Sequence, residues 1–372
     1  MRIGFDLRRI GNPGIGRYMK CLVEAVIQEG PEHEYVLLLP PGTESILQGG
    51  NANIRKIATT VKYYSIREQF VLPGLLRENG VEIFHSPHFL IPLIRPCPTV
   101  VTIHDLIYIT CKEDLPSFAG RLYYKWMMEA AARLCRSIIT DSEYSKTDIV
   151  RHLGVDPRQV AVIYPGIDPQ FRPVRDEVKL AKVREKYGIK SDYVLYTGIY
   201  KPRKNHAALL RAFENFLQTG VAVQLVFAGP ADGSEVGLRR LASEFGITDQ
   251  VVFAGFVSDE DLPALYSSAR IYACPSLYEG FGFTVLEAMT CGTPVVCTRE
   301  TSLPEVAGQG ALYADPRQRD EFALALHRAF TDEDLRRQLI ASGFANVKRF
   351  SWQTAAKATL DVYGEAVQMR SL

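Results

Sequence analysis

Short, uninterrupted apolar runs separated by helical stretches recur along the whole 372-residue chain. Runs such as 34–39 (EYVLLL) and 223–228 (VQLVFA) are apolar at consecutive positions, as expected of parallel strands buried on both faces. Amphipathic stretches such as 205–218, 235–246 and 321–330 lie between the runs. The alternation predicts an α/β fold built from doubly wound parallel sheets. The predicted strands are 1–6, 34–39, 54–58, 81–85, 99–103, 137–141, 160–164, 193–197, 223–228, 250–254, 270–274, 294–298 and 311–313.

A proline-rich segment separates two halves of this pattern. Residues 164–177 (YPGIDPQFRPVRDE) follow a strand and show no helical period, so we interpret them as an interdomain linker. The predicted domains are Rossmann-like and cover 1–168 and 169–350. The last predicted helix, 351–370, is about 30 Å long at ~1.5 Å per residue. It is long enough to return to the first domain, which therefore also includes 351–372.

The overall composition excludes several classes of protein. The 43 Lys and Arg residues nearly balance 42 Asp and Glu, which leaves a net charge of +1 and no basic face for a nucleic acid. Seven cysteines, an odd number without a C-x-x-C pair, predict neither a disulfide framework nor a zinc site and favour a reducing compartment. The charged N-terminus does not resemble a signal peptide, and no run of about 18 apolar residues occurs. We therefore expect a soluble, cytoplasmic protein.

The strongest local motif is 278–296 (YEGFGFTVLEAMTCGTPVV), where a glycine-rich turn leads into a helix predicted at about 283–290. Glycines allow close backbone approach to a ligand, and the first N–H groups of a helix bind anions. Glu279 and Glu287 flank this anion site, and each carboxylate can accept hydrogen bonds from hydroxyls, one set on a sugar and one on a ribose. In the alternative, Glu279 is a loop residue and Glu287 compensates the helix dipole.

A second motif, 197–213 (TGIYKPRKNHAALLRAF), delivers three cations just after a strand: Lys201, Arg203 and Lys204. The carboxyl end of a parallel strand is where α/β folds bind ligands. A diphosphate in a confined site needs positive charge, from a metal or from fixed Arg and Lys side chains. The alternative is a solvated basic turn.

Two acidic strings resemble metal ligands but fit helix capping better. The strings 259–261 and 332–334 follow Ser258 and Thr331, and each precedes a helical pattern. We therefore expect no metal site, and Arg203 with its neighbouring lysine would serve in place of a metal.

In the first half, the turn 11–17 (GNPGIGR) follows the first strand and opens a helix, so Gly14 and Gly16 can approach an anionic group or simply form a tight turn. His104 ends the strand 99–103, where it can donate to a hydroxyl or transfer a proton. His85 and His88 end another strand, and for them a structural role is the stronger interpretation.

Helix 121–135 (RLYYKWMMEAAARLC) mixes basic and aromatic side chains. This composition is typical of an interfacial membrane helix, but also of an ordinary half-buried one, which we favour.

Taken together, these motifs closely resemble the retaining glycosyltransferases of the GT-B architecture in the family called group 1 or GT4. The resemblance spans essentially the whole chain and is most specific in the E-x7-E pair of Glu279 and Glu287. The segments YPGID, PRKN, GFV (255–257) and FSW (350–352) also match family patterns. The resemblance implies two Rossmann-like domains facing a central cleft, with the acceptor on the first domain and the nucleotide-sugar donor mainly on the second.

The resemblance also assigns roles to individual residues. Glu279 would bind the sugar hydroxyls and Glu287 the hydroxyls of the ribose. The backbone of Val257 would bind the base, and the two cations of the PRKN segment would bind the diphosphate. One departure is Ile199, which stands after Gly198 where many members have an arginine. The implied catalytic residues are His104, Arg203, Lys204 and Glu279, and the implied donor-binding residues are Gly14, Gly16, Val257, Phe281, Gly282, Phe283, Thr284 and Glu287.

The implied activity is that of a hexosyltransferase acting on a glycan or lipid-linked acceptor. Transfer would proceed on the front face of the sugar with retention, without a metal and without a cofactor, because the nucleotide sugar is a substrate. The PRKN and GIGRY segments favour GDP-mannose, and UDP-glucose or UDP-GlcNAc is the alternative donor. A GT-B sugar-nucleotide epimerase or a non-catalytic nucleotide-sugar-binding protein would also account for the motifs. We expect no nucleic-acid partner and at most weak peripheral contact with the inner face of a membrane.

Overall fold

The chain forms two compact units in its computed structural model, here called unit 1 and unit 2. Unit 1 comprises Met1–Asp168 and Phe350–Leu372, and unit 2 comprises Pro169–Arg349. The first boundary therefore lies inside the proline-rich segment, and the second lies one residue before the predicted position. Residues 369 and 370 of the predicted last helix lie outside the described part of the chain. The structure describes residues 1–12, 14–47, 53–114, 117–230 and 233–368.

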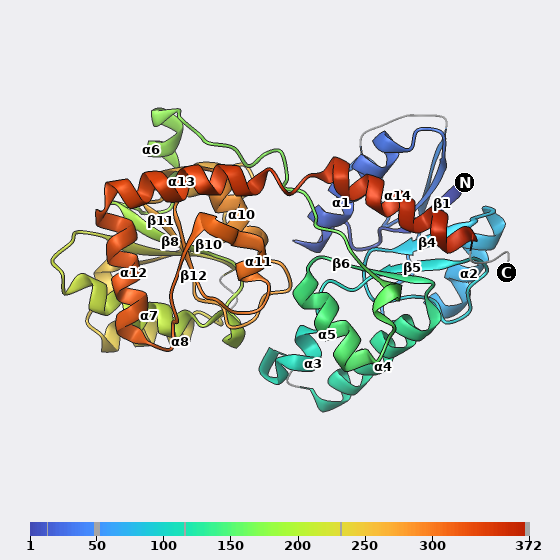
Figure 1. Cartoon of the computed structure of the whole chain (residues 1–372), viewed down its shortest axis with the longest axis horizontal. Helices are drawn as coiled ribbons and strands as arrows, with labels where there is room; N and C mark the ends of the chain where they lie inside the picture. Colours follow the sequence, from blue (N-terminus) through green and yellow to red (C-terminus); the bar gives the residue numbers. More distant parts are fainter. Residues whose placement is uncertain (13, 48–52, 115–116, 231–232, 369–372) are drawn as a thin grey trace. The chain divides into compact units, whose positions relative to one another are not determined.

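Unit 1 is a seven-stranded sheet with the strand order β3-β2-β1-β4-β5-β6-β7, in which every neighbouring pair is parallel. Figure 1 shows its helices flanking the sheet. The strands are β1 (Arg2–Asp6), β2 (Glu34–Leu39), β3 (Ile54–Ala58), β4 (Ile83–Ser86), β5 (Thr99–Thr102), β6 (Ser137–Thr140) and β7 (Val160–Val162). The helices are α1 (Ile15–Glu29), α2 (Glu68–Glu78), α3 (Ile107–Thr110), α4 (Phe118–Leu134), α5 (Glu143–Leu153) and α14 (Trp352–Gln368).

Unit 2 is a six-stranded sheet with the order β10-β9-β8-β11-β12-β13, again parallel throughout. Its strands are β8 (Tyr193–Thr197), β9 (Gln224–Ala228), β10 (Val251–Gly255), β11 (Ile271–Cys274), β12 (Val295–Cys297) and β13 (Ala311–Tyr313). Its helices are α6 (Glu177–Lys186), α7 (His206–Leu217), α8 (Val236–Glu244), α9 (Leu262–Ser268), α10 (Phe283–Thr290), α11 (Leu303–Ala307), α12 (Arg319–Thr331) and α13 (Glu333–Val347).

Both sheets confirm the predicted doubly wound α/β fold, and each predicted strand is present. The physical reason is visible in the central strands, where β8 and β9 are buried at every position. Boundaries differ where a turn competes with the sheet. The strand predicted at 81–85 begins only at Ile83, because the Val81 N–H donates to the Leu76 carbonyl at the end of α2 instead. Helix α4 begins before the predicted position because the Ser117 hydroxyl caps it, accepting from the Gly120 N–H at 3.2 Å.

The last helix packs on unit 1, against α1 and the sheet (Figure 1). Its Tyr363 hydroxyl lies 2.5 Å from Nδ1 of His85. At the helix start, the Trp352 ring packs edge-on against Tyr18, with the ring centroids 5.7 Å apart. None of the helices in the described ranges combines the length and the apolar content that a membrane span requires.

The strand orders fix where each unit can bind a ligand. In unit 1 the chain winds outward from β1 on one side and from β4 on the other, and in unit 2 it does so from β8 and β11. In open α/β sheets, ligands bind outside the carboxyl ends of the strands at such a switch point.

Candidate functional site

The two motifs predicted in the second half of the chain meet at the switch point of unit 2. Strand β8 leads into the 3₁₀ turn Pro202–Lys204, and strand β11 leads into the glycine-rich loop before α10. The Leu277 N–H of the second loop donates to the carbonyl of Arg203 in the first, at 2.8 Å. The two loops are therefore fastened to each other beside the ends of neighbouring strands.

At this junction, Lys204 and Glu279 form an ion pair although they lie 75 residues apart in the sequence. The Lys204 Nζ donates to Oε1 of Glu279 at 2.5 Å, and the side chains are only 12% and 10% exposed. The Ser276 hydroxyl donates to the same oxygen at 2.7 Å. Charge-assisted bonds of this kind are short and directional, so they hold both side chains in one orientation.

Glu279 is a carboxylate in this setting. Burial raises its pKa, but the charge and hydrogen bond of Lys204, the Ser276 hydroxyl and the charge of Arg203 together outweigh burial. The pKa of Glu279 consequently lies below its ordinary value of 4.5. A carboxylate accepts hydrogen bonds and does not donate a proton, so Glu279 suits the binding of hydroxyls and is no general acid.

The loop before α10 requires a glycine at its last position. Gly282 has φ of 105°, a conformation that residues with a side chain rarely adopt, and a Cβ there would lie 2.9 Å from Leu303. The chain then turns directly into α10, whose first N–H groups, including those of Phe283 and Thr284, have no helical acceptor. N–H groups at such a helix start can bind an anion, so the anion site here stays a prediction.

Residues 301–302 hold the backbone of the same loop through hydrogen bonds. The Ser302 hydroxyl lies 2.9 Å from the carbonyl oxygen of Glu279 and 3.0 Å from that of Phe281. The Glu279 N–H donates to the Thr301 hydroxyl at 3.0 Å. Thr301 itself has a positive φ of 54°. Because three hydrogen bonds fix this backbone, the loop is ordered before any ligand arrives.

Glu287 is buried on the second turn of α10 and is held by a tyrosine that the sequence did not reveal. The Tyr266 hydroxyl donates to Oε2 of Glu287 at 2.9 Å. Oγ1 of Thr197, the last residue of β8, lies 2.6 Å from the same hydroxyl. A chain of hydrogen bonds therefore links the end of β8 to Glu287, which makes simple dipole compensation an incomplete description of this residue.

The other predicted donor residues lie around the same edge of unit 2. Val257 is buried just beyond the carboxyl end of β10, two strands from β8 in the sheet. Phe281 is buried, and its ring centroid lies 5.0 Å from that of Phe283. Ile199 is 43% exposed just beyond the end of β8. Arg203 follows in the 3₁₀ turn, adjacent to Lys204.

The remaining predicted residues belong to unit 1. Gly14 has φ of 73° at the start of α1. Gly16 allows a close turn, because a Cβ there would lie 2.1 Å from the carbonyl oxygen of Ile10. Asn12 accepts from the Gly16 N–H at 2.9 Å, while Pro13 of the same motif lies outside the described residues. The turn brings the start of α1 to the carboxyl end of β1, at the switch point of this unit.

His104 is part of a polar pair. Its Nδ1 lies 2.6 Å from Oδ2 of Asp141, and its Nε2 lies 3.3 Å from the carbonyl oxygen of Pro87. The Tyr18 ring packs edge-on against the imidazole, with centroids 4.6 Å apart. Burial lowers the pKa of His104, but the nearby Asp141 carboxylate raises it by more, so the pKa lies above its ordinary value. His104 can thus carry a positive charge near neutral pH.

His85 and His88 have different surroundings. His85 is fully buried between Tyr363 and Thr102, and burial lowers its pKa to about 3, so it is a neutral core residue. His88 is also buried, and its Nε2 lies 2.9 Å from the Arg9 guanidinium. Burial and the Arg9 charge hold the pKa of His88 well below its ordinary value.

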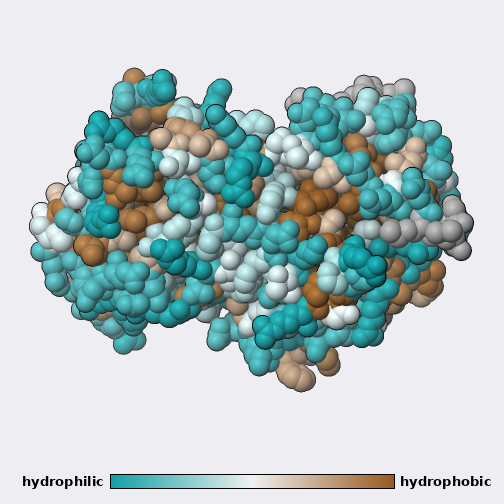
Figure 2. Space-filling model, viewed as in Figure 1, coloured by the Kyte–Doolittle hydropathy of each residue, from teal (hydrophilic) through white to brown (hydrophobic). Residues whose placement is uncertain are grey.

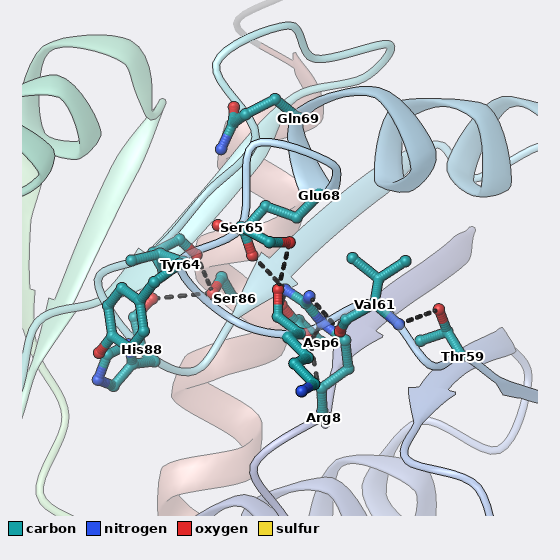
Figure 3. A network of polar contacts seen from close by, with 12 residues as sticks. Asp6, Arg8, Thr59, Val61, Tyr64, Ser65, Glu68, Gln69, Ser86 and His88 are labelled. Carbon is teal, nitrogen blue, oxygen red and sulfur yellow. Dashed lines mark hydrogen bonds and ion pairs between the residues drawn. The ribbon is translucent and has the colours of Figure 1, made fainter.

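Figure 3 shows a buried polar network next to His88, at the carboxyl end of β1. The Arg8 guanidinium donates to Asp6 at 2.7 Å and to Glu68 at 3.1 Å. Burial raises the pKa of Glu68 to about 7, although Arg8 opposes the shift. Neither carboxylate was singled out from the sequence, and the network fixes the start of α2 against β1.

The two acidic strings behave differently from each other. Asp332 caps α13 as predicted, accepting from the Leu335 N–H at 3.0 Å. The prediction of a second cap is wrong in its detail, because the Asp261 carboxylate accepts from Lys186 and Tyr187 instead of the N–H groups of α9. Within the described ranges, no three His, Cys, Asp or Glu side chains gather in a way that could hold a metal ion.

Comparison with protein families gives two matches. Residues 181–345 match the model described as Glycosyl transferases group 1, and residues 13–171 match the model described as Glycosyltransferase Family 4. The first match lies in unit 2 and the second lies almost entirely in unit 1.

Individual relatives agree with these matches. The chain is 34% identical over 292 residues to the O-antigen chain mannosyltransferase B of Escherichia coli, covering 77% of this chain and 75% of that protein. It is 29% identical over 281 residues to the serotype-specific mannosyltransferase WbdA of Escherichia coli, covering 73% of this chain but about a third (34%) of that longer protein. The structure of Anabaena HepE in complex with UDP and glucose superposes with a TM-score of 0.76 at 20% identity, covering 98% of this chain and 100% of HepE.

Proposed function

The chain belongs to the group 1 (family 4) glycosyltransferases and has their GT-B fold, and we propose that it transfers mannose from GDP-mannose to a glycan or lipid-linked saccharide, with retention and without a metal. The observation that carries this proposal is the fixed cluster of Lys204, Glu279 and the start of α10 at the switch point of unit 2. It combines cations and helix N–H groups for a diphosphate with a carboxylate for hydroxyls, which are the two chemistries of a sugar nucleotide.

In this proposal the cations stabilise the leaving group. Bond cleavage between the sugar C1 and the diphosphate oxygen leaves a second negative charge on the β-phosphate. Lys204, Arg203 and the N–H groups at the start of α10 would hold that charge, in place of a metal ion. Because hydrogen bonds hold the Lys204 side chain and the loop before α10 in place, little reorganisation of these groups is needed when the charge develops.

The bond changes balance without a protein nucleophile. As the C1–O bond breaks, the sugar becomes oxocarbenium-like, and the acceptor hydroxyl forms a new bond to C1 on the same face. The acceptor proton passes to the leaving phosphate oxygen, so the products are the glycoside and the nucleoside diphosphate. Glu279 would hold sugar hydroxyls, Glu287 the ribose, and the backbone of Val257 the base.

The residues of unit 1 complete the proposal. The turn containing Gly14 and Gly16 would contact the phosphates, and the charged form of His104 would donate to a hydroxyl of the sugar. Two relatives named mannosyltransferases support mannose as the sugar, and one of them is named for the O-antigen chain, which supports a polysaccharide acceptor. UDP-glucose or UDP-GlcNAc remains the alternative donor.

The test is slow donor hydrolysis with each nucleotide sugar in the presence of a chelator. We expect GDP-mannose to be hydrolysed to GDP and mannose, and the mannose first released to have the anomeric configuration of the donor. If the protein hydrolysed a UDP-sugar but not GDP-mannose, mannose transfer from GDP-mannose would be excluded. Conversion of the donor into its epimer without an acceptor would indicate the epimerase instead, and loss of activity on chelation would contradict metal independence.

A further inference from the structure

Exposed hydrophobic side chains are concentrated on one surface of unit 1. Thirteen large hydrophobic side chains are exposed in the described residues, and the six on unit 2 are scattered over four different helices and two loops. The seven on unit 1 lie in only three short segments, 62–70, 91–96 and 117–126. They are Tyr64, Ile66, Phe70, Ile94, Phe118, Leu122 and Trp126, here called the α2–α4 surface.

The three segments are in contact, so the surface is continuous. The Tyr64 ring packs against those of Tyr123 and Tyr124 on α4, with centroids 6.1 and 5.9 Å apart. On the other side, the Leu93 N–H donates to Oε1 of Gln69 on α2 at 2.7 Å, which places the loop containing Ile94 beside α2. Figure 2 shows hydrophobic side chains at the surface in the part of unit 1 where Figure 1 places α2 and α4.

Helix α4 is apolar on two sides. Met127 and Met128 are buried in the core of unit 1, as an ordinary half-buried helix requires. Phe118, Leu122 and Trp126 recur every four residues on another face and are 74%, 60% and 51% exposed. The preference for an ordinary half-buried helix is therefore incomplete, because core packing does not account for this second apolar face.

Within the three segments, basic residues outnumber acidic ones. The three segments contain five basic residues and one acidic residue, Glu68, which is buried against Arg8. One of the five, Lys125, also lies 3.8 Å from Glu129 on the next turn of α4. The whole chain has a net charge of only +1, so this excess is local. The five basic residues are Lys62, Arg67, Arg95, Arg121 and Lys125.

We propose that the α2–α4 surface docks the protein on an anionic lipid bilayer. The aromatic and aliphatic side chains would enter the headgroup region while the basic residues contact lipid phosphates, as in interfacial helices. A second copy of the chain fits less well, because a symmetric dimer through this surface would bring two sets of five cations together. The inference concerns where the enzyme works and is independent of which sugar it transfers.

The test is sedimentation of the full chain with vesicles of phosphatidylcholine alone or with added phosphatidylglycerol. We expect binding to the anionic vesicles that weakens with salt, and no comparable binding to the neutral ones. Leu122→Glu should reduce binding at least tenfold, and Arg121→Gln by about fivefold, since a basic residue near an anionic surface contributes roughly 1 kcal/mol. Leu324→Glu is the matched control, because Leu324 is 59% exposed on α12 of unit 2.

The outcomes separate the possibilities. Equal loss in the Leu122 and Leu324 variants, or no binding of the wild type to anionic vesicles, would overturn the proposal. A dimer in solution that Leu122→Glu converts to a monomer would assign the surface to a second copy instead. Donor hydrolysis measured on the same variants reports the sugar-nucleotide site separately, so failure of lipid binding is distinguishable from failure of the proposed activity.

Discussion

Removing one partner of the Lys204–Glu279 pair has a predictable effect on stability. Lys204→Met leaves the Glu279 carboxylate buried with Ser276 as its remaining direct partner. Loss of one partner of a buried ion pair typically costs about 3–5 kcal/mol. Because the two side chains here are 12% and 10% exposed, we expect the lower end, about 3 kcal/mol of unfolding free energy at pH 8.

The stability loss in Lys204→Met should depend on pH in a defined direction. In the wild type the pKa of Glu279 lies below its ordinary value of 4.5, so the pair stabilises fully above that pH and the contribution is lost as the pH falls through the folded-state pKa. In Lys204→Met, the charge and hydrogen bond of Lys204 no longer counteract the effect of burial, so the pKa of Glu279 should rise. Lowering the pH then protonates and relieves the buried carboxylate, so the stability difference from wild type should shrink from pH 8 towards pH 5.

The assay is isothermal denaturation of the full chain at both pH values, for the wild type, the two single variants and the double variant. Lys204→Met with Glu279→Gln removes both charges, so it should recover most of the lost stability, to within about 1 kcal/mol of the wild type. A loss below about 1 kcal/mol in Lys204→Met, or the same loss at pH 8 and pH 5, would refute the reasoning.

Three further substitutions test the surroundings of the site. Gly282→Ala should cost about 1–3 kcal/mol and weaken donor binding, because φ of 105° is strained for alanine; thermal unfolding and donor titration measure the two effects. Tyr266→Phe removes the hydroxyl that holds Glu287, so KM for the donor should rise at least threefold with a smaller change in kcat; an unchanged KM would count against it. Asp141→Asn should lower the pKa of His104, as followed by NMR. Because the folded-state pKa is raised in the wild type, the pair stabilises below pH 6.5 and loses this effect as the pH rises, so the stability gap should narrow between pH 6 and pH 9.

The strands were predictable because each corresponds to a short, continuous apolar run in the sequence. A parallel strand buried on both faces needs consecutive apolar residues, and runs such as β8 and β9 show that pattern without interruption. The loops of the site were predictable for a related reason. Glycine before a helix and cations after a strand are local signals, and Gly282 and Lys204 both lie where those signals placed them.

The partners of these residues could not be read in the same way. Tyr266 and Asp141 are ordinary positions in the sequence, and only the winding of the sheets brings them to Glu287 and His104. For the helix now seen as α4, the sequence offered an interfacial helix as an alternative but could not decide in its favour. Periodicity identifies an amphipathic helix, but it does not reveal that apolar side chains such as Leu122 lie outside the core.

The central claim is that the loop cations of unit 2 hold a diphosphate without a metal, and binding of nucleotides in a chelating buffer tests it most directly. Calorimetric titration would compare each nucleoside diphosphate with its monophosphate, for the wild type and for Arg203→Gln with Lys204→Met. We expect the diphosphate, GDP above all, to bind the wild type at least tenfold more tightly than the monophosphate, and the difference to disappear in the double variant. Equal affinity of the wild type for GDP and GMP, or tight diphosphate binding only after a divalent metal is added, would contradict the claim.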